Sequence, residues 1–285
     1  MRDFRPLALS LMPDVMEAAR AMMRHFANRG DFDTKSDGSP VTAADTECEE
    51  IVIAALARVA PGVPVIAEEA VASAGATPSS ASARFFLVDP LDGTKEFISG
   101  RGDFTLNIAL VEDGTPRFGL IYAPALARLY LTLSDEEAVA TTLDPENGNW
   151  QSALGSATRL AARPVSPGRS RVMVASRAHG AAELERWLRD SAVEVGGMTS
   201  IGSSLKFCLV ADGTADLYPR LSPTMEWDTA AGHAIAVAAG AIVTDAAGAP
   251  LRYGKTETGF RNPGFIVWSS PDDLILGELK AALPS

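Results

Sequence analysis

The sequence predicts a layered protein of two subdomains. In the first, helices are followed by strands (α+β), and in the second, strands and helices alternate (α/β). Its 285 residues correspond to two domains of about 150 residues each. Hydrophobic residues make up 47% of the chain and charged residues 21%, so the chain can bury a substantial core. Turn-forming residues and weak periodicity mark residues 134–170 as a junction. We place the boundary there, which gives subdomains 1–145 and 146–285.

The first subdomain begins with two helices and continues with strands. Apolar residues recur at intervals of three and four over residues 12–26 and 45–59, which predicts helices, and Pro13 suits the first turn of the first one. Residues 71–83 are rich in Ala, Ser, Gly and Thr, which predicts a loop. Short apolar runs bounded by turn residues predict strands at 63–66, 85–88, 104–111, 118–122 and 130–133.

In the second subdomain, strands and helices alternate, which indicates a layered α/β sheet. The predicted strands are 171–175, 215–218, 241–244 and 265–268. The predicted helices are 181–191, 206–211, 228–239 and 271–282.

The acidic charge balance disfavours several classes of partner. Thirty-six acidic and 25 basic residues give a net charge of -11. Because nucleic acids and anionic lipids are bound through clustered Lys and Arg, neither is an expected partner. A site built from carboxylates, for acid–base chemistry or for hard metal ions, agrees with this balance.

The cysteines and the apolar segments predict the cellular compartment. Cys48 and Cys208 have no Cys or His neighbour at metal-ligand spacing, so we expect free thiols in a reducing environment. The first residues lack the apolar core of a signal peptide. The uncharged stretch between Asp228 and Asp245 is shorter than the ~20 residues of a membrane-spanning helix. We therefore expect a cytoplasmic protein without a transmembrane segment.

Two aspartates follow the apolar run 85–88 and are the most informative residues for chemistry. Pro90 keeps Asp89 extended, and Gly93 permits a sharp turn after Asp92. If a helical turn begins at Gly93, its free N–H groups point toward the carboxylates, which suits a complex of Mg²⁺ and phosphate. An acidic turn with an Asp cap is the structural alternative. The haloacid-dehalogenase phosphatases are disfavoured, because their two Asp residues are two positions apart rather than three.

Two further acidic positions extend this pattern. Glu68 and Glu69 follow the strand at 63–66, where one carboxylate can turn inward and the other toward solvent. Asp228 precedes a run of small residues, which is typical of a helix N-terminus with an Asp cap. Each is by itself a common cap or surface acid. Together with the two aspartates above, they favour a metal site.

Three sequence blocks resemble the signature of the inositol monophosphatase superfamily, namely residues 65–69, 89–97 and 227–233. Four more segments are similar to its bacterial 3'(2'),5'-bisphosphate nucleotidase branch, namely residues 39–45, 200–207, 217–220 and 262–265. The resemblance covers the chain from about residue 40 onward, apart from residues 134–170. It implies an αβαβα sandwich and an enzyme of sulfur assimilation that hydrolyses adenosine 3',5'-bisphosphate to AMP and phosphate. It also implies sensitivity to Li⁺.

The resemblance implies a centre with two Mg²⁺ ions and a third, weaker ion near Glu68. The first ion takes Glu68, Asp89 and the backbone carbonyl of Leu91. The second ion takes Asp89, Asp92 and Asp228. In a two-metal site, one ion activates the attacking water and the other neutralises the leaving oxygen, so no strong protein base is needed.

The resemblance also implies roles in handling the water and the scissile phosphate. Asp45 and Thr94 are implied to form a hydrogen-bonded pair that orients the water, with Asp45 accepting its proton. Glu68 is expected to be a catalytic residue together with Asp45 and Thr94. The backbone amides of Gly93 and Thr94 are implied to receive the scissile phosphate.

The rest of the substrate needs its own anchors. By resemblance, Lys206 and Arg220 bind the 5'-phosphate, and Ser203 and His179 contact the ligand. The structural alternatives are a snorkelling lysine, a surface arginine and a loop histidine. The remaining residues expected to border the substrate are Glu68, Leu91, Asp92, Gly93, Thr94 and Asp228.

Some features depart from the pattern of the branch or are expected to be structural. Residues 143–160 form a longer segment than is typical. Glu226 adds a negative charge next to the site, which puts the substrate preference in question. His233 and Trp227 are expected to pack in the interior.

Two other functions stay open at this level. One is an inositol or sugar monophosphatase that uses the same site, and the other is a non-catalytic nucleotide or metal sensor. The segment 95–97 and Lys206 favour the nucleotide, because a small polyol phosphate needs no second anionic anchor. The sequence leaves the oligomeric state open, with a homodimer as one option, and some relatives lie on the inner face of the plasma membrane.

Overall fold

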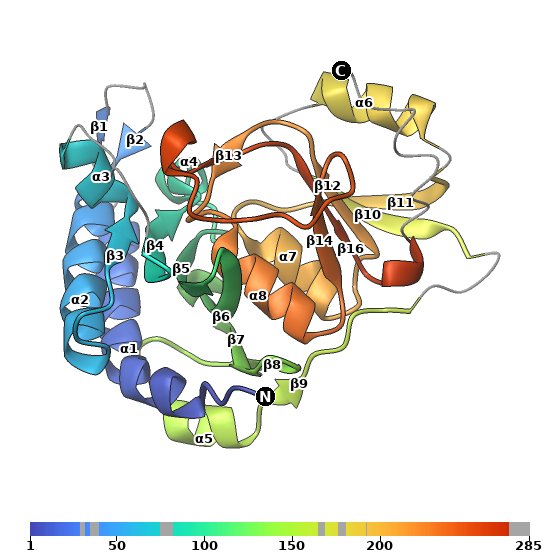
Figure 1. The fold of residues 1–285 in the computed structure, drawn as a ribbon. Helices are drawn as coiled ribbons and strands as arrows, with labels where there is room; N and C mark the ends of the chain where they lie inside the picture. Colours follow the sequence, from blue (N-terminus) through green and yellow to red (C-terminus); the bar gives the residue numbers. More distant parts are fainter. Residues whose placement is uncertain are drawn as a thin grey trace.

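Helices and sheets alternate in five layers, in the order α, β, α, β, α (Figure 1). The first layer holds α1 (Arg5–Ala27) and α2 (Ala43–Val59), the middle layer holds α7 (Leu205–Ala211) and α8 (Ala230–Ala238), and the last layer contains α6 (Ala181–Asp190). This arrangement confirms the expected αβαβα sandwich. The computed structural model describes residues 1–28, 32–34, 40–74, 82–164, 169–175, 181–191 and 193–273.

The larger sheet has seven strands in sequence order, β3-β4-β5-β6-β7-β8-β9. Strand β3 is parallel to β4, and each later neighbour is antiparallel. Consecutive residues of β4 serve different cores, since Phe85 packs toward the middle helices and Phe86 toward α1 and α2. The strands are β3 (Val65–Ala67), β4 (Arg84–Asp92), β5 (Thr105–Glu112), β6 (Thr115–Ala123), β7 (Arg128–Ser134), β8 (Glu137–Thr142) and β9 (Thr158–Arg159).

The smaller sheet has five strands in the order β11-β10-β12-β16-β14. Strand β10 is parallel to both of its neighbours, whereas β16 is antiparallel to both of its own. Trp187 of α6 packs on its outer face. The strands are β10 (Arg171–Ala175), β11 (Val195–Ser200), β12 (Leu217–Arg220), β14 (Ile242–Asp245) and β16 (Phe265–Trp268).

Two short strand pairs and several short helices complete the described part of the chain. The pairs are β1 (Asp33–Thr34) with β2 (Pro40–Val41), and β13 (Thr224–Met225) with β15 (Arg261–Asn262). The short helices are α3 (Glu68–Ala74), α4 (Thr94–Ile98), α5 (Trp150–Gly155) and the 3₁₀ turns η1 (Pro124–Leu126), η2 (Thr256–Thr258) and η3 (Pro271–Asp273).

The middle helices fit between the sheets because small residues line their contacts. A Cβ atom on Gly119 of β6 would collide with the backbone carbonyl of Ala231 in α8. A Cβ atom on Gly232 would collide with the ring of Phe207 in α7. The run of Ala and Gly at the start of α8 is therefore a packing requirement of the sandwich.

The structure corrects the predicted start of the first helix. Helix α1 begins at Arg5 with Pro6 in its first turn, so Pro13 lies inside the helix rather than at its beginning. A proline there removes one i→i−4 hydrogen bond. The helix continues because its apolar face, which includes Leu11 and Val15, is buried in the hydrophobic core that α1 and α2 form with the larger sheet.

Other boundaries also differ from the sequence-based expectations. The predicted loop at 71–83 begins with the last turn of α3, which ends at Ala74, and 75–81 lie outside the described residues. The junction 134–170 contains β8, α5 and β9, and β9 still belongs to the larger sheet. The change of sheet therefore falls after Arg159, while the boundary between residues 145 and 146 stays a prediction.

The remaining expectations concern the chain's end, its thiols and membranes. Most of the predicted helix at 271–282 lies outside the described residues. Cys48 and Cys208 are buried free thiols, as expected. Across the described ranges, no helix has both the length and the apolar character that crossing a membrane requires.

Candidate active site

A partly buried acidic cluster forms where the larger sheet meets the middle helices. Carboxylate oxygens of Glu68, Asp89 and Asp228 lie within 4.8 Å of one another. The parallel pairing of β3 with β4 places Ala67 opposite Val88, so Glu68 and Asp89 leave the sheet side by side. Asp228 comes from the turn before α8, so both halves of the chain contribute to the cluster.

The electrostatics of the cluster favour a bound cation. Burial, reinforced by the charges of Glu68, Asp92, Asp228 and Asp45, raises the pKa of Asp89 well above its usual range. Burial followed by the charges of Asp92 and Glu68 raises the pKa of Asp228 to about 7. Like charges at this separation are costly unless a positive charge compensates them. An all-carboxylate donor set fits a hard cation such as Mg²⁺.

A bulge at the end of β4 explains the three-residue spacing of the two aspartates. Asp89 pairs with Asn107 and Asp92 with Thr105, so β4 carries one extra residue there, as in a β-bulge. Within this bulge the backbone N–H of Leu91 donates to Asp89 Oδ1 at 3.0 Å. The bulge turns both carboxylates to the same end of the sheet.

Gly93 follows this bulge and begins α4. Its φ of +93° is a conformation that favours glycine. A Cβ atom would also lie 3.3 Å from the backbone oxygen of Asp103. The first N–H groups of α4 are therefore available beside the acidic cluster.

The structure brings Asp45 and Thr94 together. Thr94 Oγ1 donates to Asp45 Oδ1 at 3.3 Å, and it also lies 3.2 Å from the backbone oxygen of Leu91. The second oxygen of Asp45 accepts from both the N–H and the hydroxyl of Thr42, each at 2.7 Å, in a capping box at the start of α2. The carboxylate is thus fixed in direction, while the catalytic role of the pair stays a prediction.

Two polar residues of the site were missed in the sequence. Ser204 Oγ lies 2.7 Å from Asp92 Oδ2 and 2.6 Å from the backbone oxygen of Asp228, and it accepts from Asn107 Nδ2 at 2.9 Å. Ser204 therefore bridges the acids of the two halves. The available signal was Asn107, a polar residue inside an otherwise apolar strand, which needs a hydrogen-bond partner when buried.

A cavity of about 560 Å³ opens in front of the acidic cluster. Asp45, Asp89 and Leu91 are buried beside it. His179 lies outside the described residues. The other predicted site residues line the cavity: Glu68, Asp92, Gly93, Thr94, Ser203, Lys206, Arg220 and Asp228. Lys95 and Arg261, which the sequence reasoning did not assign to the substrate, line it as well.

Lys206 is a buried cation rather than a snorkelling lysine, and its role as a phosphate anchor stays a prediction. Its side chain is 4% exposed, and Nζ donates to the backbone oxygens of Ile201, at 3.3 Å, and Ser203. It also lies over the ring of Tyr218. Burial lowers the pKa of Lys206 to about 8. The ammonium group therefore holds the loop that presents Ser203, a residue with φ of +50°.

Arg220 has donor capacity left for a ligand. It stands at the end of β12, is partly buried and lines the cavity beside Tyr218. Its Nε is buried and has no hydrogen-bond partner among the described residues. Because Arg220 lines the cavity, its guanidinium group can donate hydrogen bonds to an anion there. The alternative of a solvated surface arginine is wrong.

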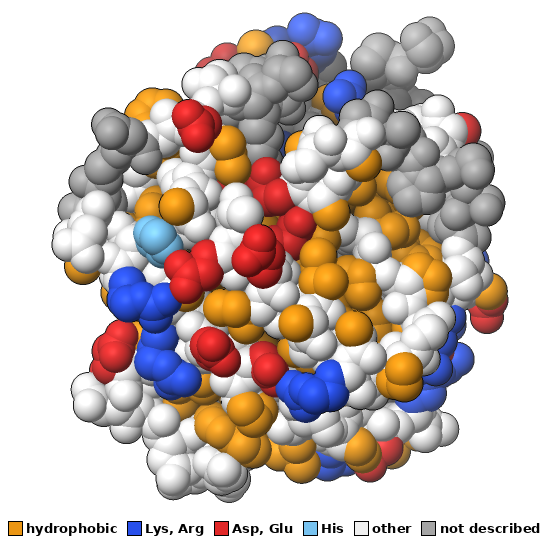
Figure 2. Space-filling view, turned by 90° about the vertical axis from the view of Figure 1, so that its left-hand side faces the viewer, with side chains coloured by type: hydrophobic (Ala, Val, Ile, Leu, Met, Phe, Trp, Pro, Cys, Tyr) orange, Lys and Arg blue, Asp and Glu red, His pale blue; other side chains and the backbone are white. Residues whose placement is uncertain are grey.

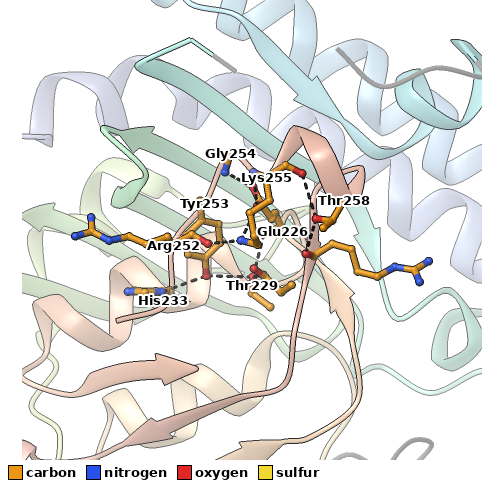
Figure 3. Close-up of polar contacts among 10 residues, drawn as sticks. Glu226, Thr229, His233, Arg252, Tyr253, Gly254, Lys255 and Thr258 are labelled. Atoms are coloured by element: carbon orange, nitrogen blue, oxygen red, sulfur yellow. Dashed lines mark hydrogen bonds and ion pairs between the residues drawn. The ribbon is translucent and has the colours of Figure 1, made fainter. Parts of the chain in front are cut away.

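Glu226 does not add charge to the cavity, which corrects the expectation about substrate preference. It is fully buried, and its carboxylate points to Gly254 and Lys255 (Figure 3). His233 is packed as expected, with Nδ1 3.2 Å from the hydroxyl of Tyr253, and burial lowers its pKa to about 3. Trp227 is buried in the core, also as expected.

The acidic excess of the chain also appears on its surface. Acidic side chains gather near the middle of the face that carries α1 and α2 (Figure 2). On the α2 and α3 side, Glu49, Glu50 and Glu69 line a second cavity of about 460 Å³.

Comparison with known proteins identifies close relatives. The model of the inositol monophosphatase family matches residues 6–281. The 3'(2'),5'-bisphosphate nucleotidase CysQ of Escherichia coli (strain K12) is 44% identical over 237 residues, covering 83% of this chain and 88% of the relative. The crystal structure of CysQ from Bacteroides thetaiotaomicron has a TM-score of 0.70 at 35% identity, covering 93% of this chain and 97% of that one. An inositol monophosphatase from Zymomonas mobilis has a TM-score of 0.74 at 23% identity, covering 99% of each chain, and shares the fold.

Proposed function

Because the chain belongs to the inositol monophosphatase family, we propose that it is a Mg²⁺-dependent 3'(2'),5'-bisphosphate nucleotidase. It hydrolyses the 3'-phosphate of adenosine 3',5'-bisphosphate and releases AMP and phosphate. The observation that carries this proposal is the acidic cluster of Glu68, Asp89 and Asp228 at the wall of a cavity that also contains Arg220. The cluster suits the scissile end of the substrate, and the arginine suits a second phosphate. The similarity to the nucleotidase of Escherichia coli supports the same assignment.

The carboxylates divide between two Mg²⁺ positions. Glu68, Asp89 and the carbonyl of Leu91 would hold the first ion, and Asp89, Asp92 and Asp228 would hold the second. A third, weaker ion would bind near Glu68. Bound Mg²⁺ supplies an acidified water as the nucleophile and neutralises charge on the leaving oxygen.

Asp45 and Thr94 handle the proton of the attacking water. Thr94 Oγ1 accepts the hydrogen bond of the water while donating its own hydrogen to Asp45 Oδ1, so the proton passes toward the carboxylate. The capping box at Thr42 holds Asp45 in this direction. The N–H groups of Gly93 and Thr94, at the beginning of α4, bind the oxygens of the scissile phosphate.

The second phosphate binds to Arg220, whose side chain lines the cavity. Lys206 contributes by holding the Ser203 loop and by its positive charge, and Ser203 and His179 complete the substrate contacts. The protein acts in the cytoplasm, within sulfur assimilation, and Li⁺ inhibits it by occupying a Mg²⁺ position.

One assay tests the proposal against the same site acting on inositol or sugar phosphates. Phosphate release is measured from adenosine 3',5'-bisphosphate, inositol monophosphate and fructose bisphosphate, with Mg²⁺ and after chelation. We expect Mg²⁺-dependent release that is fastest from the adenosine compound. Equal or faster release from inositol phosphate would overturn the nucleotidase assignment. Release from none of the three would favour a metal or nucleotide sensor.

A further inference from the structure

We propose that Glu226 is a positioning residue for Asp228. Together with Lys255 it holds the segment 252–260 against the turn that carries Asp228, and it thereby sets the affinity of the site for its cation. The inference rests on the proposed function in one respect, the assignment of Asp228 as a metal ligand. Glu226 itself does not border the cavity and touches no substrate.

The side chain of Glu226 makes three polar contacts although it is 0% exposed (Figure 3). Its carboxylate accepts from the backbone N–H of Gly254 at 2.7 Å and from that of Lys255 at 3.0 Å. Lys255 Nζ forms an ion pair with it at 2.7 Å and lies over the ring of Tyr253. A buried carboxylate with this set of partners is a fixed attachment point for the segment 252–260.

The backbone of Glu226 forms the turn around Asp228. Its N–H donates to the backbone oxygen of Phe260 at 2.8 Å. Its carbonyl accepts from the N–H groups of Thr229 and Ala230, at 3.2 and 3.0 Å, and so begins α8. Asp228 lies inside this turn. Any displacement of Glu226 therefore moves the Asp228 carboxylate.

A chain of side-chain hydrogen bonds holds the same turn from the side of α8 (Figure 3). Thr229 Oγ1 donates to the carbonyl of Glu226 at 3.1 Å. The hydroxyl of Tyr253 donates to Thr229 Oγ1 at 3.1 Å, and it can accept from Nδ1–H of a neutral His233. The segment 252–260 thus contacts the turn directly through the carboxylate and the backbone N–H of Glu226, and indirectly, by way of Thr229, through its carbonyl.

The position of Asp228 needs such support because its surroundings repel it. Asp92 and Glu68 carry like charges next to it. Among the described residues, the hydroxyl of Thr224 and the N–H of Met225, at 3.1 Å, donate to Asp228 Oδ2, and the positive charge of Arg220 also opposes this repulsion. Without a firm turn, the carboxylate would rotate away before a cation arrives. Groups that orient metal ligands in this way commonly change metal affinity by about 10- to 100-fold.

The test measures Mg²⁺ binding to the full chain by titration calorimetry in the absence of substrate. The variant is Glu226→Gln, which keeps the size and one acceptor of the side chain but loses the anion. The matched control is Asp216→Asn at the opposite end of β12 from Arg220. Asp216 is likewise a buried carboxylate, paired with Arg169 and accepting a backbone N–H from Val172. We expect Glu226→Gln to weaken Mg²⁺ binding about 10-fold, and Asp216→Asn to lower the melting temperature with unchanged Mg²⁺ binding.

Two outcomes would overturn the inference. One is unchanged Mg²⁺ affinity in Glu226→Gln, and the other is equal weakening in both variants. If Glu226→Gln does not fold, Lys255→Met decides by the same measurement, since it removes the ion pair and keeps both backbone contacts. The Mg²⁺ affinity of Lys255→Met should fall by a smaller factor than that expected for Glu226→Gln. An unchanged Mg²⁺ affinity in Lys255→Met would reject the inference. The variant Asp228→Asn tests the proposed function separately from this inference. A Mg²⁺ affinity equal to that of the unmodified protein would show that Asp228 is not a metal ligand.

Discussion

Thr94 Oγ1 donates a hydrogen bond to Asp45 Oδ1 at 3.3 Å, and this contact joins α2 to the turn that follows β4. The other oxygen of Asp45 is occupied by two donors from Thr42. One carboxylate thus caps a helix with one oxygen and faces the proposed water position with the other. Asp45 therefore contributes both to the local stability of α2 and to the proposed proton path.

Asp45→Asn should separate these two roles. The amide can keep its oxygen toward Thr42, so the cap survives, but its NH₂ group then donates to Thr94 and the hydroxyl can no longer pass a hydrogen to residue 45. We expect kcat to fall by about 100- to 10,000-fold, with a melting temperature close to that of the unmodified protein. Steady-state kinetics and thermal melting check this. A kcat within threefold of the original would refute the role of Asp45 in proton transfer.

Arg220→Ala should affect a substrate with two phosphates more than one with a single phosphate. The lost guanidinium removes a donor for the second phosphate, so KM should rise at least tenfold for adenosine 3',5'-bisphosphate and little for adenosine 3'-monophosphate. Arg252→Ala is a suitable control, because Arg252 is an exposed arginine outside the cavity that contacts Thr115. An equal rise for both substrates in Arg220→Ala would make Arg220 a structural residue.

Removal of Mg²⁺ should destabilise the protein. A cation that binds only the folded chain adds about 2.7 kcal/mol at one hundred times its dissociation constant. We therefore expect Mg²⁺ to raise the melting temperature and a chelator to reverse this. In Asp92→Asn the rise should shrink and turnover should fall by orders of magnitude. Differential scanning calorimetry with and without Mg²⁺ checks this, and an undiminished rise in Asp92→Asn would exclude Asp92 as a ligand.

Acid should destabilise the protein through His233. Burial lowers the pKa of His233 to about 3, below its ordinary value near 6.5, so the unfolded chain binds this proton more readily than the folded chain. The contribution of neutral, buried His233 to the free energy of unfolding is fully present above pH 6.5. It falls by about 1.4 kcal/mol per pH unit between pH 6.5 and 3. Urea unfolding from pH 7 to pH 5 should therefore show a steeper loss in the original protein than in His233→Leu. Comparing the two slopes cancels the contribution of the acidic cluster, and parallel slopes would contradict the prediction.

Local chemistry made much of the site predictable from the sequence. The residue pattern of the turn after β4 predicted converging carboxylates, because Pro90 and Gly93 constrain their own backbone whatever the rest of the chain does. The apolar periodicity likewise predicted α2 at 45–59, close to its observed bounds Ala43–Val59. The acidic positions Glu68 and Asp228 were added to this turn as further candidates for a metal site, but their approach to Asp89 depends on the tertiary structure, and the assignment of each carboxylate to an ion came from the family resemblance.

The features that the sequence could not predict depend on contacts between distant segments. The bridge through Ser204 requires Asn107, which is far away in the chain. Glu226 was expected to face the cavity because it is close to Asp228 in sequence, yet its partner Lys255 draws it into the interior. Pro13 gave a misleading helix start, because burial of one face of α1 outweighs the loss of one hydrogen bond.

The close contact of Gly119 with Ala231 has a consequence for how the protein unfolds. The helix that follows Asp228 touches the larger sheet through this contact and the smaller sheet through its other side. Neither sheet can lose its order without exposing the apolar surface of the shared helices to water. Heating should therefore melt both halves in a single cooperative transition, and the acidic cluster should lose its structure at the same temperature as the whole sandwich.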